Sequence, residues 1–344
     1  MAEASHIVVA GAGAIGRTVA YLLARAGHAV TVIDPDPETG AQASRIAAGM
    51  LAPAFEALFD EAPVGLLREA LALWRPLARE IGLPIAWEGA MAPGDRAQAE
   101  AWCAALADLG VEAELRDLGD DYWAAYSDED RQLDPELALQ LLRGAAERLG
   151  ARYQTGRVTG FADGSVRIEG AEPMAADRLV VATGAGQALV DLAPALAVLE
   201  PIKGHVLRTP GAFAGVPVVR GPSVYLCRTP WGTVLGATME PGRSDEAVDP
   251  DIVEDLLERA SALSGGLRRL SWTAAAGVRA STPDGLPLVG EAREGLILAV
   301  GARRNGWLLA PMIAEVVLDA VAGRPRGAAA QLFDPGRFQV GRFD

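Results

Sequence analysis

The chain has 344 residues, of which 50% are hydrophobic, and this is enough for one large domain or for two interleaved domains with a sizeable core. Its 31 Lys and Arg residues against 45 Asp and Glu residues give a formal net charge of −14 at pH 7. This acidic balance argues against nucleic acid or an anionic membrane as a partner, because proteins that bind either one present a basic field.

The cysteine and histidine residues indicate a cellular compartment and bear on whether the chain binds a metal. The two cysteines, Cys103 and Cys227, are too few for a disulfide framework, which favours a reducing, cytoplasmic compartment. The histidines His6, His28 and His205 are scattered, and no Cys/His spacing fits zinc, so no metal site is predicted. We expect neither a signal peptide nor a membrane span, because the start lacks a basic region and no uncharged apolar run approaches ~20 residues.

The start of the chain predicts a strand, a glycine loop, a helix and a second strand. Residues 6–10 (HIVVA) form a β-branched run typical of a buried strand. Apolar residues then recur at helical spacing from Ile15 to Ala26, and Gly27 ends this helix. Residues 28–34 (HAVTVID) predict a second strand that ends on an acid. The pattern indicates a β–α–β unit.

The next third of the chain contains two clear helices around an ambiguous region. Residues 66–80 predict a helix, whereas residues 85–130 mix strand and helix signals. A well-marked helix follows Asp134, a suitable N-cap, with Pro135 in its first turn and Gly150 at its end.

The remaining elements alternate between buried strands and a region rich in turns. They are a buried strand with a glycine turn (177–186), an antiparallel meander (202–240), a helix (250–263), a last buried strand (295–302) and an apolar helix (307–323). Parallel-type strands therefore occur at both ends and in the middle, with the meander between them. This order predicts two domains that share the chain discontinuously.

The glycine loop after the first strand predicts a dinucleotide site. Gly11, Gly13 and Gly16 fit GxGxxG, in which glycines allow the tight turn, the close approach of a pyrophosphate and close packing of helix on strand. Asp34 follows eighteen residues after Gly16, where an acid can bind a ribose hydroxyl. The competing interpretation is a tight turn alone. The motif does not choose between nicotinamide and flavin dinucleotides.

Three further segments bear on that choice. Residues 44–53 (SRIAAGMLAP) and 180–186 (VVATGAG) are rich in small side chains, which let the backbone pass close to a large flat ligand, although core packing would explain either one alone. In residues 300–311 (VGARRNGWLLAP), Arg303 and Arg304 interrupt an apolar run. Adjacent guanidiniums repel each other and lose hydration, so this pair predicts either a surface position or a permanent anion.

Together these segments resemble the D-amino acid oxidase family of FAD-dependent enzymes, and most closely its glycine oxidase branch, which serves bacterial thiamine biosynthesis. The blocks that carry the resemblance are GAGAIG, AAGMLAP, PIKGHVL, VYLCRTPWGTVLGATMEPG, GVRASTPDGLPLVG and GARRNGWLLAP, in family order across residues 7–311. Residues 55–130 match little.

The resemblance implies an α/β fold with two interleaved domains. A Rossmann-like FAD-binding domain would comprise residues 1–84, 145–202 and 277–344. An α+β substrate-binding domain, built on a mostly antiparallel sheet, would comprise residues 85–144 and 203–276.

It also implies noncovalent FAD, because no residue after Cys227 could serve as a cysteine tether. The ADP half would lie against Ala14, Ile15 and Asp34, with the adenine at Val158, and residues 302–308 would wrap the isoalloxazine. The residues implied to bind FAD are Gly11, Gly13, Ala14, Ile15, Gly16, Asp34, Ala43, Ser44, Gly49, Met50, Leu51, Val158, Gly184, Ala302, Arg303, Arg304, Asn305, Gly306, Trp307 and Leu308.

Four residues are implied at the substrate. Arg279 aligns with the arginine that binds the substrate carboxylate, Tyr225 and Met239 with residues that line the pocket, and Arg304 with an arginine that borders it. A carboxylate is best held by a planar, permanently charged fork, which Arg supplies and Lys does not. Without the resemblance, Arg279 could be a surface arginine, and Tyr225 and Met239 could be plain core residues.

The chain departs from the family pattern near this site. Ala302 and Arg303 stand where the family usually has a histidine and then an aromatic or similar residue. Trp307 replaces a smaller aliphatic residue, and Ala280 replaces a proline. These changes bear on substrate identity more than on cofactor identity, since Trp307 could narrow the pocket toward glycine or stack on the flavin.

The implied reaction is hydride transfer to flavin from the Cα of glycine or of a small amine or D-amino acid. It would give an imine and, with dioxygen, hydrogen peroxide, and the imine could feed thiamine thiazole synthesis. Two alternatives stay open: an amino acid dehydrogenase that uses a quinone or carrier acceptor, and a non-catalytic flavin-binding protein. A nicotinamide dehydrogenase would leave the RRNG block unexplained. A homo-oligomer is compatible with the sequence.

Overall fold

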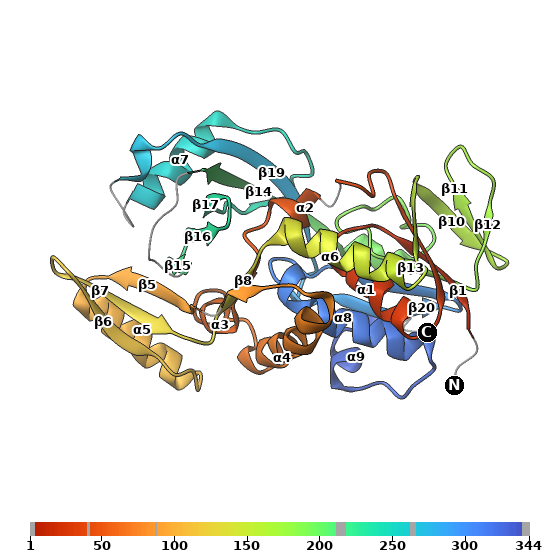
Figure 1. The fold of residues 1–344 in the computed structure, drawn as a ribbon, viewed down its shortest axis with the longest axis horizontal. Helices are drawn as coiled ribbons and strands as arrows, with labels where there is room; N and C mark the ends of the chain where they lie inside the picture. Colours follow the sequence, from red (N-terminus) through yellow and green to blue (C-terminus); the bar gives the residue numbers. More distant parts are fainter. Residues whose placement is uncertain (1–3, 40–41, 87, 211–217, 262–265, 339–344) are drawn as a thin grey trace, which may run out of the picture.

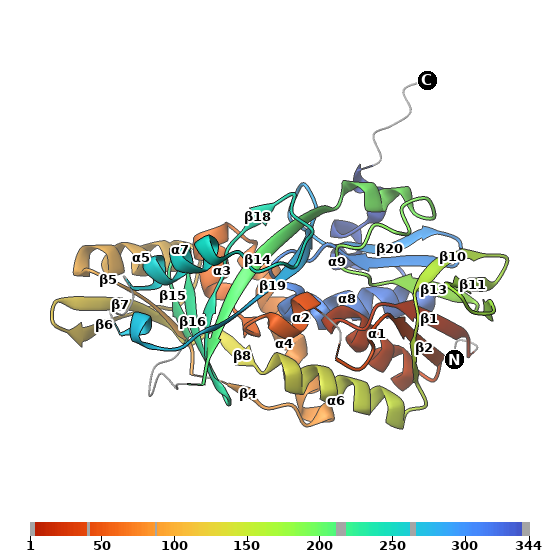
Figure 2. The ribbon, with the colours of Figure 1, turned by 90° about the horizontal axis from the view of Figure 1, so that it is seen from above.

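The computed structural model describes residues 4–39, 42–86, 88–210, 218–261 and 266–338. In this part of the chain two large sheets lie at opposite ends of the long axis, and helices cover them (Figure 1, Figure 2). This is the mixed α/β fold that the sequence predicts. None of the helices in these ranges has the length and apolar content that crossing a bilayer would require.

The first sheet holds the predicted β–α–β unit and has six strands, of which all but the edge strand β20 run parallel. In spatial order they are β20 (Leu288–Arg293), β21 (Leu296–Val300), β13 (Arg178–Val181), β1 (His6–Ala10), β2 (Ala29–Asp34) and β9 (Arg152–Thr155). The central strands are buried on both faces, which explains why their sequences are continuous apolar runs.

Three helices cover one face of this sheet: α1 (Ala14–Arg25), α6 (Pro135–Arg148) and α8 (Gly306–Val321). The predicted N-cap of α6 is confirmed, because the Asp134 carboxylate accepts from the N–H of Leu137 at 3.0 Å. The opposite face carries a small antiparallel sheet, β10 (Val158–Ala162), β11 (Ser165–Ile168) and β12 (Met174–Ala175).

The glycine loop between β1 and α1 admits no side chain at two positions. Gly11 has φ +110°, and a Cβ there would lie 2.3 Å from the carbonyl oxygen of Ala182. A Cβ on Gly16 would lie 2.0 Å from the carbonyl oxygen of Gly11. The loop therefore needs glycine both for its turn and for close packing of α1 on the sheet.

The second sheet is mostly antiparallel and has nine strands. In spatial order they are β18 (Glu240–Pro241), β14 (Glu200–Thr209), β17 (Gly232–Gly236), β16 (Tyr225–Thr229), β15 (Val218–Arg220), β5 (Ala90–Gly94), β7 (Tyr122–Ser127) and β6 (Glu114–Gly119), with β19 (Thr273–Ser281) also paired to β14. Helices α5 (Arg96–Asp108) and α7 (Pro250–Ser261) pack on this sheet.

Two sequence predictions need adjustment in this second sheet. The meander is confirmed for β15, β16 and β17, but β14 pairs with β17 rather than with β15. The helix predicted over residues 250–263 is α7, which is described to Ser261; residues 262–263 lie outside the described ranges.

The connecting elements lie between the two sheets. They are α2 (Gln42–Ile46), β3 (Met50–Leu51), α3 (Pro53–Asp60), α4 (Val64–Ile81), β4 (Ile85–Ala86) and β8 (Arg131–Leu133), while α9 (Ala328–Leu332) follows α8. The chain passes from one sheet to the other several times. Helix α6 packs on α1, although its first residues fall in the segment 85–144. The exact domain boundaries stay a prediction.

Candidate active site

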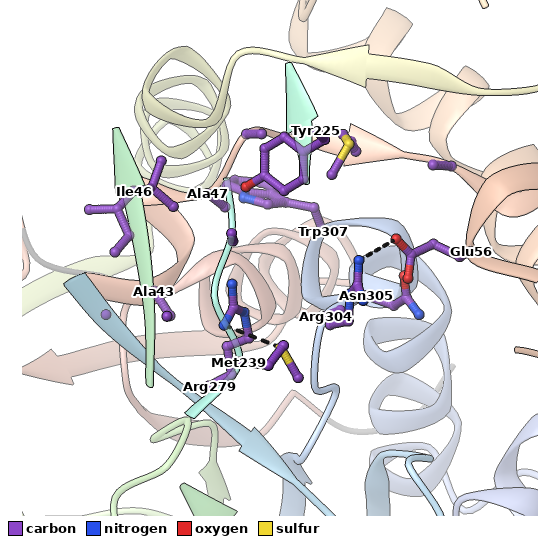
Figure 3. A pocket seen from close by; sticks show the side chains of 18 residues that line it. Ala43, Ile46, Ala47, Glu56, Tyr225, Met239, Arg279, Arg304, Asn305 and Trp307 are labelled. Atoms are coloured by element: carbon purple, nitrogen blue, oxygen red, sulfur yellow. Dashed lines mark hydrogen bonds and ion pairs between the residues drawn. The ribbon is translucent and has the colours of Figure 1, made fainter. Parts of the chain in front are cut away.

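A pocket lies where α2, β3 and the start of α8 meet β14 and β19 (Figure 3). It spans about 730 Å³, counting the part open to solvent. Its lining is formed by Ala43, Ile46, Ala47, Ala48, Gly49, Met50, Ala52, Glu56, Gly204, Val206, Tyr225, Ala237, Met239, Gly277, Arg279, Arg304, Asn305 and Trp307. The pocket therefore brings together all four residues expected around a substrate.

Arg279, on β19, points into this pocket without a carboxylate partner among the described residues. Its Nη1 donates to the carbonyl oxygen of Thr238 at 3.3 Å and contacts the sulfur of Met239 at 3.6 Å. Burial lowers the pKa of this guanidinium, although arginine stays charged. A cation enclosed in this way is stabilised by an anion, and the open side of the pocket is where such an anion can bind.

Strand β14 makes room for Arg279. A Cβ on Gly204 would lie 2.2 Å from Arg279 Nη1 and 2.7 Å from the carbonyl oxygen of Thr238. Gly204 is therefore needed where it stands, because any side chain would displace the guanidinium.

Tyr225 and Met239 complete the wall around Arg279. Tyr225 is 7% exposed, and its hydroxyl oxygen would lie 2.3 Å from a Cβ on Gly236, so this glycine lets the phenol reach the pocket. Burial raises the pKa of Tyr225 to about 12, which keeps the hydroxyl protonated and able to donate a hydrogen bond. Met239 offers an adaptable apolar surface.

Arg304 differs from Arg279 because the protein supplies its anions. Its Nη1 lies 2.7 Å from Asp60 Oδ1. Its Nη2 lies 3.3 Å from Glu56 Oε1 (Figure 3). Glu56 also pairs with Arg220 at 2.7 Å. Burial alone would raise the pKa of Glu56, but the guanidiniums of Arg220 and Arg304 bring it below its ordinary value. Of the two alternatives predicted for the arginine pair, a surface position or an anion, Arg304 thus meets the second through two carboxylates on α3.

Its neighbour Arg303 adopts φ +48°, a conformation uncommon for residues with side chains. Its N–H donates to the carbonyl oxygen of Ala280 at 2.8 Å. Arg303 and Ala280, which both depart from the family pattern, therefore contact each other at the edge of the pocket.

Sequence reasoning missed this carboxylate and guanidinium cluster. Glu56 and Asp60 are spaced i, i+4 on α3, which places them on one face and could have indicated a shared partner. The pairing with Arg220 joins residues 164 positions apart and has no local signal.

The expected FAD residues fall into two groups. Ala43, Gly49, Met50, Arg304, Asn305 and Trp307 line the pocket itself. The others extend from it along the first sheet: Gly11, Gly13, Ala14, Ile15, Gly16, Asp34 and Ser44 around the glycine loop, Val158 at the start of β10, Gly184 after β13, Leu51 on β3, and Ala302, Arg303, Gly306 and Leu308 around the start of α8.

Hydrogen bonds connect the two groups. Ser44 Oγ accepts from the N–H of Ala14 at 3.0 Å, and the Ser44 carbonyl accepts from Trp307 Nε1 at 3.0 Å. Asp34 Oδ2 accepts from the N–H of Ala12 at 2.8 Å, so this acid also holds the glycine loop. Trp307 is 5% exposed and its ring centroid lies 6.2 Å from that of Trp74, so the indole is fixed by packing.

The residues present fit a flavin dinucleotide. Two helices, α1 and α8, begin here; the N-cap of α1 is Gly13, which has no side chain, and the side chain of Asn305, the N-cap of α8, makes no capping hydrogen bond. Their positive ends suit a pyrophosphate and an electron-rich ring. A Cβ on Gly306 would meet no atom within 4 Å, which leaves open space at the start of α8. Within the described ranges, no group of three or more His, Cys, Asp or Glu residues could hold a metal ion.

Comparison with known proteins points the same way. Residues 6–320 match the sequence model of a family described as FAD dependent oxidoreductase. Glycine oxidase of Geobacillus kaustophilus is 28% identical, over 93% of this chain and 94% of that protein. A Rhizobium etli protein whose name assigns it to the thiamine biosynthesis oxidoreductases is 32% identical, over 91% and 95%.

The match to the bifunctional protein ThiO/ThiG of Trichormus variabilis is 29% identical and covers 97% of this chain but 55% of that protein, so the chain spans about half of its length. Among solved structures, the crystal structure of glycine oxidase from Geobacillus kaustophilus superposes with a TM-score of 0.84 at 25% identity, over 98% of this chain and 100% of that one.

Proposed function

The chain belongs to the family of FAD-dependent oxidoreductases, and from this premise we propose that it oxidises glycine or another small amine that carries a carboxylate. The observation that carries the proposal is the guanidinium of Arg279, which faces the pocket without a carboxylate partner in the described ranges. The relatives named glycine oxidase support this substrate class.

We propose that Arg279 and Tyr225 bind the carboxylate of the substrate. The guanidinium of Arg279 binds the carboxylate through charge-assisted hydrogen bonds, and the hydroxyl of Tyr225 donates to the same group. This fixes the substrate Cα relative to residues 302–308, where the isoalloxazine is expected. Orientation of this kind supplies much of the rate enhancement when the cofactor performs the chemistry.

FAD, when bound, supplies the acceptor for the hydride of the substrate Cα and passes the two electrons to dioxygen, which gives hydrogen peroxide. The chain's part is to admit the amine as a free base: enclosure in the pocket and the guanidiniums of Arg279 and Arg304 disfavour a further cation there, so the amine releases its proton to solvent. Met239 and Trp307 exclude bulk water from the reacting face.

The product follows from the hydride and the proton that the amine loses. Loss of a hydride from Cα leaves an iminium, which becomes an imine when its nitrogen loses a proton to solvent, and water hydrolyses the imine to a carbonyl compound and ammonia. We propose that the imine can also be consumed in thiamine thiazole synthesis, in keeping with the name of the Rhizobium etli relative. We further propose that FAD is held noncovalently, and that the protein acts in the cytoplasm.

A peroxide assay tests this function. The purified protein is incubated in air with glycine, sarcosine or D-alanine, and the series is repeated with an artificial electron acceptor under nitrogen. We expect peroxide from at least one of these amines. Turnover only with the artificial acceptor would favour an amino acid dehydrogenase, and a protein that retains FAD but turns over none of them in either series would contradict the proposal.

A further inference from the structure

Strand β14 carries two buried ionisable side chains that the proposed reaction does not use. Successive side chains of a strand point to opposite faces. Gly204 and Val206 line the pocket, whereas Lys203 and His205 point to the other face and are 0% exposed. Both belong to the PIKGHVL block, for which the resemblance implies no role. Buried ionisable side chains need hydrogen-bond or ion-pair partners. The partners of Lys203 and His205 come from residues 238–249.

His205 is held by residues 238–249. The N–H of Asp249 donates to His205 Nε2 at 3.0 Å, so this nitrogen carries no proton. His205 Nδ1 therefore carries the proton and donates to Glu240 Oε1 at 2.8 Å. The Thr238 hydroxyl accepts from the His205 N–H at 2.8 Å and donates to Glu240 Oε1 at 2.7 Å. His205, Thr238 and Glu240 form a closed hydrogen-bonded triad.

Lys203 anchors the same segment at a second point. Its ammonium lies 2.5 Å from Asp245 Oδ1, and Asp245 also pairs with Arg243 at 2.8 Å. Glu240 lies opposite Lys203 in the pairing of β18 with β14. The segment is thus tied to the outer face of β14 by side chains as well as by the backbone.

The inner side of this segment faces the pocket. The carbonyl oxygen of Thr238 accepts from Arg279 Nη1 at 3.3 Å. The sulfur of Met239 lies 3.6 Å from the same nitrogen (Figure 3). These are the hydrogen-bond acceptors that the described residues offer to Arg279. The hydroxyl and the carbonyl of Thr238 therefore connect the triad on one side of β14 to the guanidinium on the other.

We propose that His205, Thr238 and Glu240 are positioning residues that set the affinity of the pocket for a carboxylate ligand. The triad fixes the Thr238 carbonyl and Met239, and these fix the direction of the Arg279 guanidinium. The identity of the substrate rests on the function proposed above, but the anion site at Arg279 can be tested without turnover.

The physical basis is the length of the arginine side chain. Several rotatable bonds separate its guanidinium from the backbone, so bidentate contact with a carboxylate needs a second point of attachment. Loss of the Thr238 hydroxyl leaves the His205 N–H and one Glu240 oxygen without that partner in a buried place, and the segment shifts to recover hydrogen bonds.

The test uses FAD-loaded protein and three variants. Thr238→Val keeps the shape but removes the hydroxyl, Thr238→Ser restores it, and Thr229→Val is the matched control. The Thr229 hydroxyl donates to the Gly232 carbonyl at 3.2 Å in the turn between β16 and β17, away from Arg279. The readouts are the Kd of glycolate, a carboxylate without an amine, from the flavin spectrum, together with FAD content, Tm and the KM and kcat for glycine.

We expect Thr238→Val to raise the glycolate Kd about tenfold, equivalent to about 1.4 kcal/mol, while FAD content stays the same. Thr238→Ser and Thr229→Val should bind glycolate like the parent. If glycine is a substrate, its KM rises with the glycolate Kd and kcat changes less.

An unchanged glycolate Kd in Thr238→Val, even with a lowered Tm, would overturn the proposal, because the triad would then serve stability alone. Parent protein that holds FAD but does not bind glycolate would also overturn it. Parent protein that binds glycolate and oxidises no amine would refute the proposed function, and the Thr238 variants would still decide the role of the triad.

Discussion

At the scale of single residues, two arginines that look alike in the sequence differ in what neutralises them. Arg304 faces Asp60 and Glu56, whereas Arg279 faces a carbonyl oxygen and a thioether. A guanidinium already paired with carboxylates has little left to offer an anionic ligand. We therefore propose that Arg279 binds the substrate carboxylate, whereas Arg304 connects the segment before α8 to α3.

The first prediction concerns Arg279 itself. Arg279→Ala removes two charge-assisted hydrogen bonds, worth about 1.5–3 kcal/mol each, and should raise the KM for glycine about 100-fold or more. FAD content should not change, because Arg279 contacts neither the glycine loop nor the start of α1. Steady-state kinetics and the flavin absorbance per chain measure the two effects. Loss of FAD with an unchanged KM would assign Arg279 to the cofactor instead.

A second prediction follows from Asp130, which lies beside the Glu56 and Arg220 pair. Its Oδ1 accepts from the N–H of Ala54 at 2.8 Å, at the start of α3. Burial raises the pKa of Asp130 from 3.8 to about 7. Between these values the folded state keeps a proton that the unfolded state releases, so raising the pH across this window lowers the free energy of unfolding.

Asp130→Asn should remove this dependence. We expect urea unfolding to show that wild-type protein loses about 3 kcal/mol more than the variant between pH 5 and pH 8, since about two pH units lie between pH 5 and the pKa and each corresponds to about 1.4 kcal/mol. Both proteins carry saturating FAD in this comparison. Equal losses in the two proteins would show that the carboxyl of Asp130 is ionised throughout the range.

At the scale of elements, β14 is the strand on which the site depends, and a glycine on it supplies a test. Gly204→Ala should displace the Arg279 guanidinium, because the new Cβ would lie 2.2 Å from Nη1. We expect the KM for glycine to rise at least tenfold, equivalent to about 1.4 kcal/mol.

The matched control for this variant is Gly65→Ala, on α4. No atom lies within 4 Å of the added Cβ there, and replacing a helical glycine by alanine stabilises a protein by about 0.5–1 kcal/mol. The control should therefore keep its KM and gain in Tm. A KM that is equal in the two variants would mean that the Arg279 guanidinium can shift without a loss of affinity for the substrate carboxylate.

Elements with a local signal could be predicted from the sequence. The strand β1, the glycine loop and α1 follow from β-branched and helical periodicity over about twenty adjacent residues, and α6 follows from the cap at Asp134. Residues 85–130 could not be assigned in the same way. There β5 pairs in parallel with β15, across more than 120 residues of intervening chain, and β6 is an exposed strand with weak alternation.

At the scale of the whole molecule, the pocket forms between the second sheet and the elements that connect it to the first sheet. Its lining comes from α2, β3, α3, β14, β16, β19 and the start of α8, which are widely separated in the chain. The resemblance placed Arg279, Tyr225 and Met239 in this pocket in advance. The i, i+4 spacing of Glu56 and Asp60 does not indicate which cation they neutralise, and the triad behind Arg279 consists of side chains that meet only through the tertiary fold.

The most direct test of the account is the absorbance of the flavin when glycine is added without oxygen. The account predicts that purified protein is yellow, and that excess glycine bleaches the flavin band in wild-type protein but not at the same concentration in Arg279→Ala. Admission of air should restore the colour. A colourless protein, or a flavin band that stays unchanged in wild-type protein across glycine, sarcosine and D-alanine, would contradict it.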